Sequence, residues 1–201
     1  MTEWLFSNVP ETSRIPVSVG LAALVLWVQE VVWLFITWRP RNHVYKDKGS
    51  FWLLALVWTS AIMLSVFDAL SFRFSTFPKE LAWMQFIGFP FLLLGFALRI
   101  PARLALGPAC APFVQTGPSH KLVTTGIYAV VRHPAYLGAF GQLVGMSLCL
   151  GSLVGLATAV VGGIPALAYR ISIEEHALRD WFGQEYDQYV RRTTRLIPHF
   201  W

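Results

Sequence analysis

The chain has 201 residues, of which 55% are hydrophobic and only 13% are charged. Soluble domains carry about 25% charged residues, so this composition excludes an ordinary soluble domain and, with nine tryptophans, indicates an integral membrane protein. The net charge of +5 fits lysine and arginine on the cytoplasmic side of a membrane, and no basic stripe interleaved with aromatics indicates a nucleic-acid partner.

Cysteine and histidine spacing gives no sign of a metal or a disulfide framework. Cys110 and Cys149 lie far apart without CxxC spacing. His120 and His133 do not belong to a cluster with metal-ligand spacing, so no metal is expected. The first residues lack a basic stretch followed by an apolar core, and a cleaved signal peptide is therefore not expected.

Apolar runs in chain order predict the membrane helices. A helix needs roughly 20 apolar residues to cross about 30 Å of hydrocarbon. The third run extends from Leu81 to about Ile100 and could reach Leu106, and Pro90 and Pro101 are expected to bend the helix. The last run is interrupted at Gly151-Ser152, which predicts a tight helical hairpin, kinked near Gly162-Gly163 and Pro165. The sequence thus predicts an all-α membrane protein with five transmembrane helices, at 16–38, 51–72, 81–100, 134–150 and 153–168, and a C-terminal amphipathic helix at 171–192 on the cytoplasmic face.

The distribution of lysine and arginine predicts the orientation of these helices. Loop 39–50, segment 99–133 and the tail after 170 are rich in basic residues, whereas loop 73–80 holds only Arg73 and Lys79. By the positive-inside rule the N-terminus lies outside, and the tail lies in the cytoplasm. One domain without internal repeats is expected.

Several charged and aromatic residues lie where predicted helices leave the membrane. Arg132-His133-Pro134 opens the fourth helix, and Arg170 and Glu174 follow the fifth at i, i+4 spacing. These groups could form an active site. Alternatively, Arg132 could be an interface anchor, Tyr128 and Tyr136 could be interface aromatics, and the Arg170–Glu174 spacing could mark a surface ion pair.

Two further charges lie within predicted helices. Glu30 lies in the cytoplasmic half of the first helix, and Arg99 lies at similar depth in the third. A charge inside the membrane usually faces a partner or a polar cavity, so Glu30 is expected to face Arg99 or its cavity. Snorkelling of Arg99 to the interface is the alternative.

The stretch His120–Tyr128, HKLVTTGIY, is a candidate cofactor loop. Neither GxGxxG after a strand nor a P-loop motif occurs, so a nucleotide-like cofactor needs another binding device. Backbone groups of this loop can pair with a purine edge, and the helix N-terminus at Pro134 favours a carboxylate.

The C-terminal half contains, in order, HKLVTTGIY, RHPAYLG, R-x3-EE and FGQEYDQY followed by IP. In this combination it resembles the isoprenylcysteine carboxyl methyltransferases. The resemblance covers about 95–198 and implies a single membrane-embedded methyltransferase domain, in which 1–80 forms the N-terminal spans. The chain resembles small prokaryotic members, which implies a prokaryotic cytoplasmic membrane.

The resemblance also implies the cofactor and its site. The cofactor would be S-adenosyl-L-methionine, with S-adenosyl-L-homocysteine as product. Arg99 and Arg170 match arginines associated with the methyl-accepting carboxylate, and Glu174 is assigned with them to catalysis. The cofactor-binding residues implied are His120, Lys121, Leu122, Val123, Gly126, Tyr128, Arg132, His133, Pro134, Tyr136, Glu174 and Glu175.

The expected reaction is methylation of a lipophilic, prenyl-like carboxylate that enters from the bilayer among the membrane lipids. A carboxylate is already ionised at pH 7 and needs orientation by an arginine fork rather than a base. A phospholipid amine or a small thiol is an alternative acceptor. An NADPH-dependent membrane reductase and a non-enzymatic membrane protein are the other possibilities considered.

Overall fold

The described residues of the computed structural model are 28, 44–45, 47–69, 75–107, 110, 115–116 and 121–197. The predicted first span at 16–38, including Glu30, lies outside them apart from Val28, and so does His120. The described helices are α3 (Ser50–Phe67), η3 (Lys79–Leu81), α4 (Met84–Leu106), η5 (Gly126–Ala129), α5 (Pro134–Leu150), α6 (Leu153–Ala157), η6 (Thr158–Gly162), α7 (Gly163–Phe182) and α8 (Gln184–Val190).

The described residues confirm a nearly all-helical membrane protein. Three helical stretches are long and apolar enough to cross a bilayer, Ser50–Phe67, Lys79–Leu106 and Leu153–Phe182, and Pro134–Leu150 is a shorter apolar helix. Large apolar side chains remain exposed along α4, as on a lipid-facing surface; they include Phe86, Leu93, Leu94, Ile100 and Leu104.

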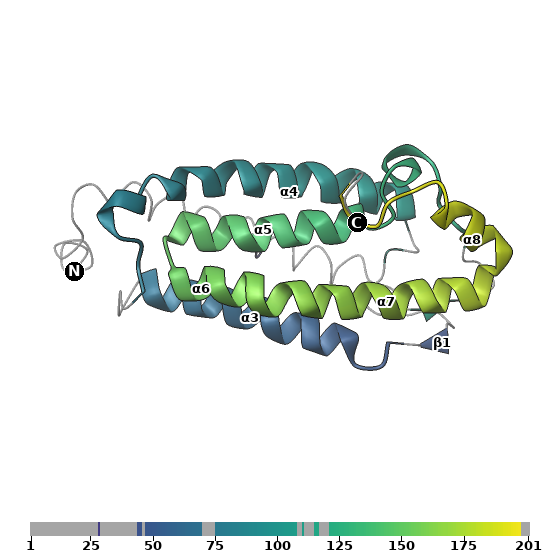
Figure 1. The fold of residues 1–201 in the computed structure, drawn as a ribbon, viewed down its shortest axis with the longest axis horizontal. Helices are drawn as coiled ribbons and strands as arrows, with labels where there is room; N and C mark the ends of the chain where they lie inside the picture. Colours follow the sequence, from purple (N-terminus) through teal and green to yellow (C-terminus); the bar gives the residue numbers. More distant parts are fainter. Residues whose placement is uncertain are drawn as a thin grey trace.

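The third predicted helix reaches the farther of its two expected ends. Both Pro90 and Pro101 lie inside α4, which continues to Leu106. This extension carries α4 to the end of the bundle where η5 and the start of α5 lie (Figure 1).

Close contact between α4 and α5 depends on glycine. These two helices run side by side along the bundle (Figure 1). A Cβ on Gly145 would lie 2.7 Å from the Gly88 carbonyl oxygen and 2.9 Å from the Leu92 nitrogen. Only a residue without a side chain allows backbones to approach so closely, as in other membrane helix pairs.

The predicted hairpin at residue 151 is confirmed. Gly151 ends α5 with φ 67°, a left-handed conformation that glycine adopts readily. Ser152 then caps α6, because its side chain accepts a hydrogen bond from the Gly155 nitrogen at 3.2 Å. α6 and α7 therefore return alongside α5 (Figure 1).

The predicted boundary between the fifth span and the tail helix is wrong. The chain remains helical from α6 through the π-helical turn η6 and α7 to Phe182. Residues 166–182 contain neither glycine nor proline, so nothing ends the helix before Gly183, whose φ is 55°. The helix predicted at 171–192 is thus the end of α7 followed by the short α8.

A small strand pair was not predicted. β1 (Val44–Tyr45) pairs antiparallel with β2 (Gln115–Thr116) in the register Val44–Thr116 and Tyr45–Gln115. β1 lies near the end of the bundle at which α8 is found (Figure 1). This end also holds the turn before α5.

Candidate active site

The turn that opens α5 is fixed to the C-terminal tail by backbone hydrogen bonds. The Arg132 nitrogen donates to the Thr194 carbonyl at 2.8 Å, and the His133 nitrogen donates to the Arg195 carbonyl at 3.0 Å. The Thr194 nitrogen donates in return to the Val130 carbonyl at 3.1 Å. Segments separated by more than fifty residues are therefore held together at the start of α5.

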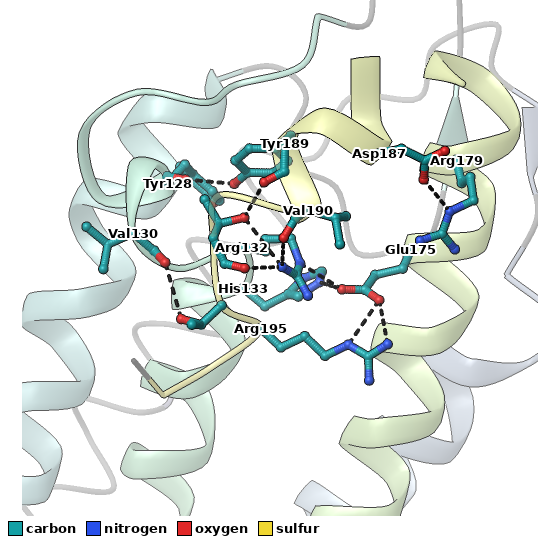
Figure 2. Close-up of polar contacts among 12 residues, drawn as sticks. Tyr128, Val130, Arg132, His133, Glu175, Arg179, Asp187, Tyr189, Val190 and Arg195 are labelled. Atoms are coloured by element: carbon teal, nitrogen blue, oxygen red, sulfur yellow. Dashed lines mark hydrogen bonds and ion pairs between the residues drawn. The ribbon is translucent and has the colours of Figure 1, made fainter. Parts of the chain in front are cut away.

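Glu175 joins α7 to this turn and to the tail (Figure 2). Its Oε1 accepts from Arg132 Nε at 3.0 Å and lies 3.3 Å from His133 Nε2, while its Oε2 accepts from Arg195 Nε at 3.0 Å. The Arg132 and Glu175 side chains are 7% and 4% exposed. Arg132 is therefore a buried structural partner, and the interface-anchor alternative does not hold for it.

Tyr136 links Arg170 to Glu174. Its hydroxyl oxygen accepts from Arg170 Nε at 2.9 Å, and its hydrogen goes to Glu174 Oε2 at 2.6 Å. The predicted shared face of Arg170 and Glu174 is confirmed, but Arg170 is only 2% exposed, so this is no surface ion pair. Among the described residues, Glu174 Oε1 has no hydrogen-bond partner and can accept from a ligand.

Asp47, immediately before α3, completes this cluster. Its carboxylate pairs with Arg170, which also donates to Ser50 Oγ at 2.9 Å. The same carboxylate also binds the first turn of α3, accepting from the Phe51 nitrogen at 2.9 Å and from Ser50 Oγ at 3.1 Å. The cluster of Asp47, Arg170, Tyr136 and Glu174 thus connects α3, α5 and α7.

Arg99, on α4, contacts another face of α5. Its Nη1 donates to Gln142 Oε1 at 2.5 Å, and its Cγ lies 2.6 Å from where a Cβ on Gly138 would be. Residues two positions apart on a helix point about 200° apart, so Gly138 and Tyr136 face different neighbours. Gln142 lies more than two turns from the start of α5, so the guanidinium points away from this helix end, which disfavours snorkelling. The expected pairing of Arg99 with Glu30 lies outside the described residues.

The candidate cofactor loop approaches the same end of the bundle. Tyr128 is buried, and its hydroxyl donates to the Ala102 carbonyl at 3.4 Å. The backbone carbonyl of Tyr128 accepts a hydrogen bond from the Tyr189 hydroxyl at 2.8 Å. Burial raises the pKa of Tyr128 and raises that of Tyr189 to about 12, so both phenols stay neutral. Lys121 and Gly126 are exposed, and Leu122 and Val123 are half-buried.

The sequence is similar to a family of known proteins and to characterised relatives. A family model described as phospholipid methyltransferase matches residues 83–185, slightly more than half of the chain. The chain is also 32% identical over 166 residues to the protein-S-isoprenylcysteine O-methyltransferase of Schizosaccharomyces pombe, covering 78% of this chain and 70% of that protein. The chain belongs to the isoprenylcysteine carboxyl methyltransferase family. It is therefore a membrane-embedded methyltransferase.

Further similarities agree with this membership. Protein-S-isoprenylcysteine O-methyltransferase B of Arabidopsis thaliana is 29% identical over 150 residues, covering 73% of this chain and 76% of that protein. The solved structure of a eukaryotic intramembrane Ras methyltransferase, also of this family, superposes with a TM-score of 0.69 at 25% identity, covering 96% of this chain and 69% of that one.

Sequence reasoning missed three candidate residues of this methyltransferase. Asp47 carried one usable signal, because an acidic residue just before an apolar run can accept from the unpaired N–H groups of a helix's first turn. Arg195 had no signal, since only the fold brings it to Glu175. Tyr186 lies in the FGQEYDQY stretch, from which no role for it was predicted, and its hydroxyl is buried without a hydrogen-bond partner among the described residues.

Within the part of the chain that the structure describes, no group of three or more histidine, cysteine, aspartate or glutamate side chains is placed to hold a metal ion. Polar atoms without a hydrogen-bond partner among the described residues include a carboxylate oxygen of Glu174 and the Tyr186 hydroxyl.

Proposed function

We propose that this methyltransferase transfers a methyl group from S-adenosyl-L-methionine to the carboxylate of a lipophilic, isoprenylcysteine-like acceptor. The names of its relatives support the acceptor class. The observation that carries the proposal is the meeting of Tyr136 and Glu174 beside the turn that opens α5. This end of the bundle would face the cytoplasm, in agreement with the lysine and arginine distribution.

The available polar groups fit this cofactor. S-adenosyl-L-methionine carries an ammonium, a carboxylate, a sulfonium, ribose hydroxyls and a purine. Glu174 Oε1 can accept from the ammonium, and the positive end of α5 at Pro134 favours the carboxylate. The Tyr186 hydroxyl can donate to a further oxygen. The segment 121–126 would contribute backbone groups and apolar contacts to the purine.

His133 enters this proposal in a changed role. Its Nε2 lies against Glu175 Oε1, whereas the family resemblance implies that His133 binds the cofactor. The structure supports a part for His133 in holding the turn and leaves Glu174 as the side chain for the cofactor ammonium. Arg132 and Glu175 would likewise shape the pocket by fixing its backbone.

The bound cofactor supplies an electrophilic methyl group on a cationic sulfur. An acceptor carboxyl with a pKa near ~3.5 is ionised at pH 7, so the protein needs no general base. Arg99 would orient that carboxylate, because a guanidinium fork matches carboxylate geometry. Alignment of two bound reactants lowers a barrier by roughly 7–11 kcal/mol in the best cases. The apolar tail would lie along the exposed surface of α4 near Leu104.

A labelling experiment tests the reaction. Detergent-solubilised protein is incubated with methyl-labelled S-adenosyl-L-methionine and either a farnesylated cysteine derivative with a free carboxylate or its methyl ester. We expect label in an alkali-labile ester with the free acid only. Alkali-stable label in phospholipid amines or thiols would contradict carboxyl methylation and favour the other acceptor classes, which need a base.

A further inference from the structure

We infer that Asp47 is a positioning residue for the cofactor side of the active site, acting through Arg170 and Tyr136 on Glu174. The inference rests on the proposed function and deepens it. It gives Arg170 a role different from the acceptor-carboxylate contact that the family resemblance implies.

The first step is the hold of Asp47 on Arg170. Arg170 is 2% exposed, Ser50 is fully buried, and Asp47 is 9% exposed. A buried guanidinium needs compensation, and removing its partner leaves an uncompensated charge. Because Asp47 is also bonded to the first turn of α3, the carboxylate itself has little freedom. Arg170 is thereby fixed against the N-terminus of α3.

The second step fixes the direction of the hydroxyl hydrogen. A guanidinium can only donate, so the bond from Arg170 Nε to the Tyr136 oxygen leaves the single hydrogen of that hydroxyl for Glu174. The bond of 2.6 Å to Glu174 Oε2 is a short, charge-assisted one. It holds the carboxylate in place while leaving Oε1 for a cationic ligand.

The third step separates this role from acceptor binding. The Arg170 Nε and Nη1 atoms are bonded to Tyr136, Asp47 and Ser50. Arg99, by contrast, lies on the α4 face of α5 beside Gln142. Loss of the Asp47–Arg170 pair should therefore weaken cofactor binding and leave the acceptor KM unchanged.

The key variant is Asp47→Asn. Asparagine keeps an oxygen that can accept from the Phe51 nitrogen, whereas the change removes the charge that holds Arg170. The matched control is Asp187→Asn, which removes the carboxylate of the exposed Arg179–Asp187 pair. Arg170→Lys is a second test, because lysine keeps the charge but lacks the planar fork that contacts both Asp47 and Tyr136.

Calorimetric titration with S-adenosyl-L-homocysteine gives the decisive readout, alongside kinetics with a farnesylated cysteine derivative and thermal unfolding in detergent. We expect Asp47→Asn and Arg170→Lys each to raise the product Kd about tenfold, the usual effect of losing a charged hydrogen bond. The acceptor KM should stay within about twofold of wild type, as should all values for Asp187→Asn.

The outcomes separate the inference from the proposed function. If the wild-type protein binds S-adenosyl-L-homocysteine and Asp47→Asn has the same Kd, the inference is overturned and the proposed function stands. A rise in acceptor KM at constant product Kd overturns it in favour of a direct carboxylate contact by Arg170. A wild-type protein that binds no S-adenosyl-L-homocysteine overturns the proposed function and the inference with it. If Asp47→Asn does not fold, Arg170→Lys decides by the same criteria.

Discussion

Glu174 and Glu175 are neighbours in the chain, yet their carboxylates point to different partners. Both oxygens of Glu175 are bonded, to Arg132, His133 and Arg195. From the residues that the structure describes, Glu174 receives one hydrogen bond, donated by Tyr136. Successive residues of a helix point about 100° apart, so α7 turns one glutamate toward the tail and the other toward Tyr136.

The first prediction concerns Glu175. Replacing it with alanine should strongly destabilise the protein, because Arg132 would remain buried without its carboxylate. Breaking a buried pair costs about 3–5 kcal/mol, which thermal unfolding in detergent would measure. The exposed pair Arg179–Asp187 serves as control, since loss of such a surface bridge costs about 0–1 kcal/mol. Equal effects at the two sites would contradict a structural role for Glu175.

The second prediction concerns Glu174. Glu174→Gln should leave the unfolding temperature almost unchanged, because the residue is only half-buried and its amide oxygen can still accept from Tyr136. Affinity for S-adenosyl-L-homocysteine should fall about tenfold or more, as expected for a lost charged hydrogen bond. Calorimetric titration measures this loss. An unchanged Kd would show that Glu174 does not meet the cofactor.

Hydrophobic length and helical spacing predicted much of the fold and part of the site. The runs that became α3, α4 and α5 were visible because a membrane helix needs a long apolar stretch. The i, i+4 spacing placed Arg170 and Glu174 on one face, which Tyr136 contacts. The boundary near residue 168 was wrong because a rise in polarity was interpreted as the end of a span, whereas α7 continues until Gly183.

The remaining parts of the site depend on contacts that leave no local pattern. Asp47 and Arg170 are 123 residues apart in the chain, and a single sequence gives no signal for such a pairing. The same holds for Arg195 and Glu175, which meet because the tail returns to the turn before α5. The different roles of Glu174 and Glu175 likewise depend on which helices surround α7.

The third prediction tests the contact between α4 and α5. Gly145→Ala should destabilise the protein, because the new Cβ would lie 2.7 Å from the Gly88 carbonyl oxygen and 2.9 Å from the Leu92 nitrogen. Gly141→Ala, on the same helix, is the matched control. Its Cβ would meet only the Phe91 carbonyl oxygen at 3.6 Å, an ordinary contact, and alanine favours a helix over glycine by about 1 kcal/mol. Thermal unfolding should separate the two variants, and similar stabilities would contradict the glycine-dependent packing.

The fourth prediction concerns Gln142, a fully buried amide beside Arg99. Its Oε1 accepts from Arg99, while its Nε2 has no hydrogen-bond partner within the described residues. Gln142→Glu would place a carboxylate against the guanidinium that we propose orients the acceptor. The added carboxylate should compete for Arg99, so the acceptor KM should rise about tenfold or more at unchanged affinity for S-adenosyl-L-homocysteine.

A matched control for this change is available on α4. Gln85 also has a buried amide atom without a hydrogen-bond partner in the described part of the chain, and it contacts Gly151 at the far end of the helix pair. Gln85→Glu should leave the acceptor KM unchanged, since no role in the site is proposed there. Steady-state kinetics with a farnesylated cysteine derivative would compare the variants. If Gln142→Glu keeps the wild-type acceptor KM, Arg99 does not bind the acceptor carboxylate, because a competing carboxylate at hydrogen-bond distance from Arg99 would raise that KM.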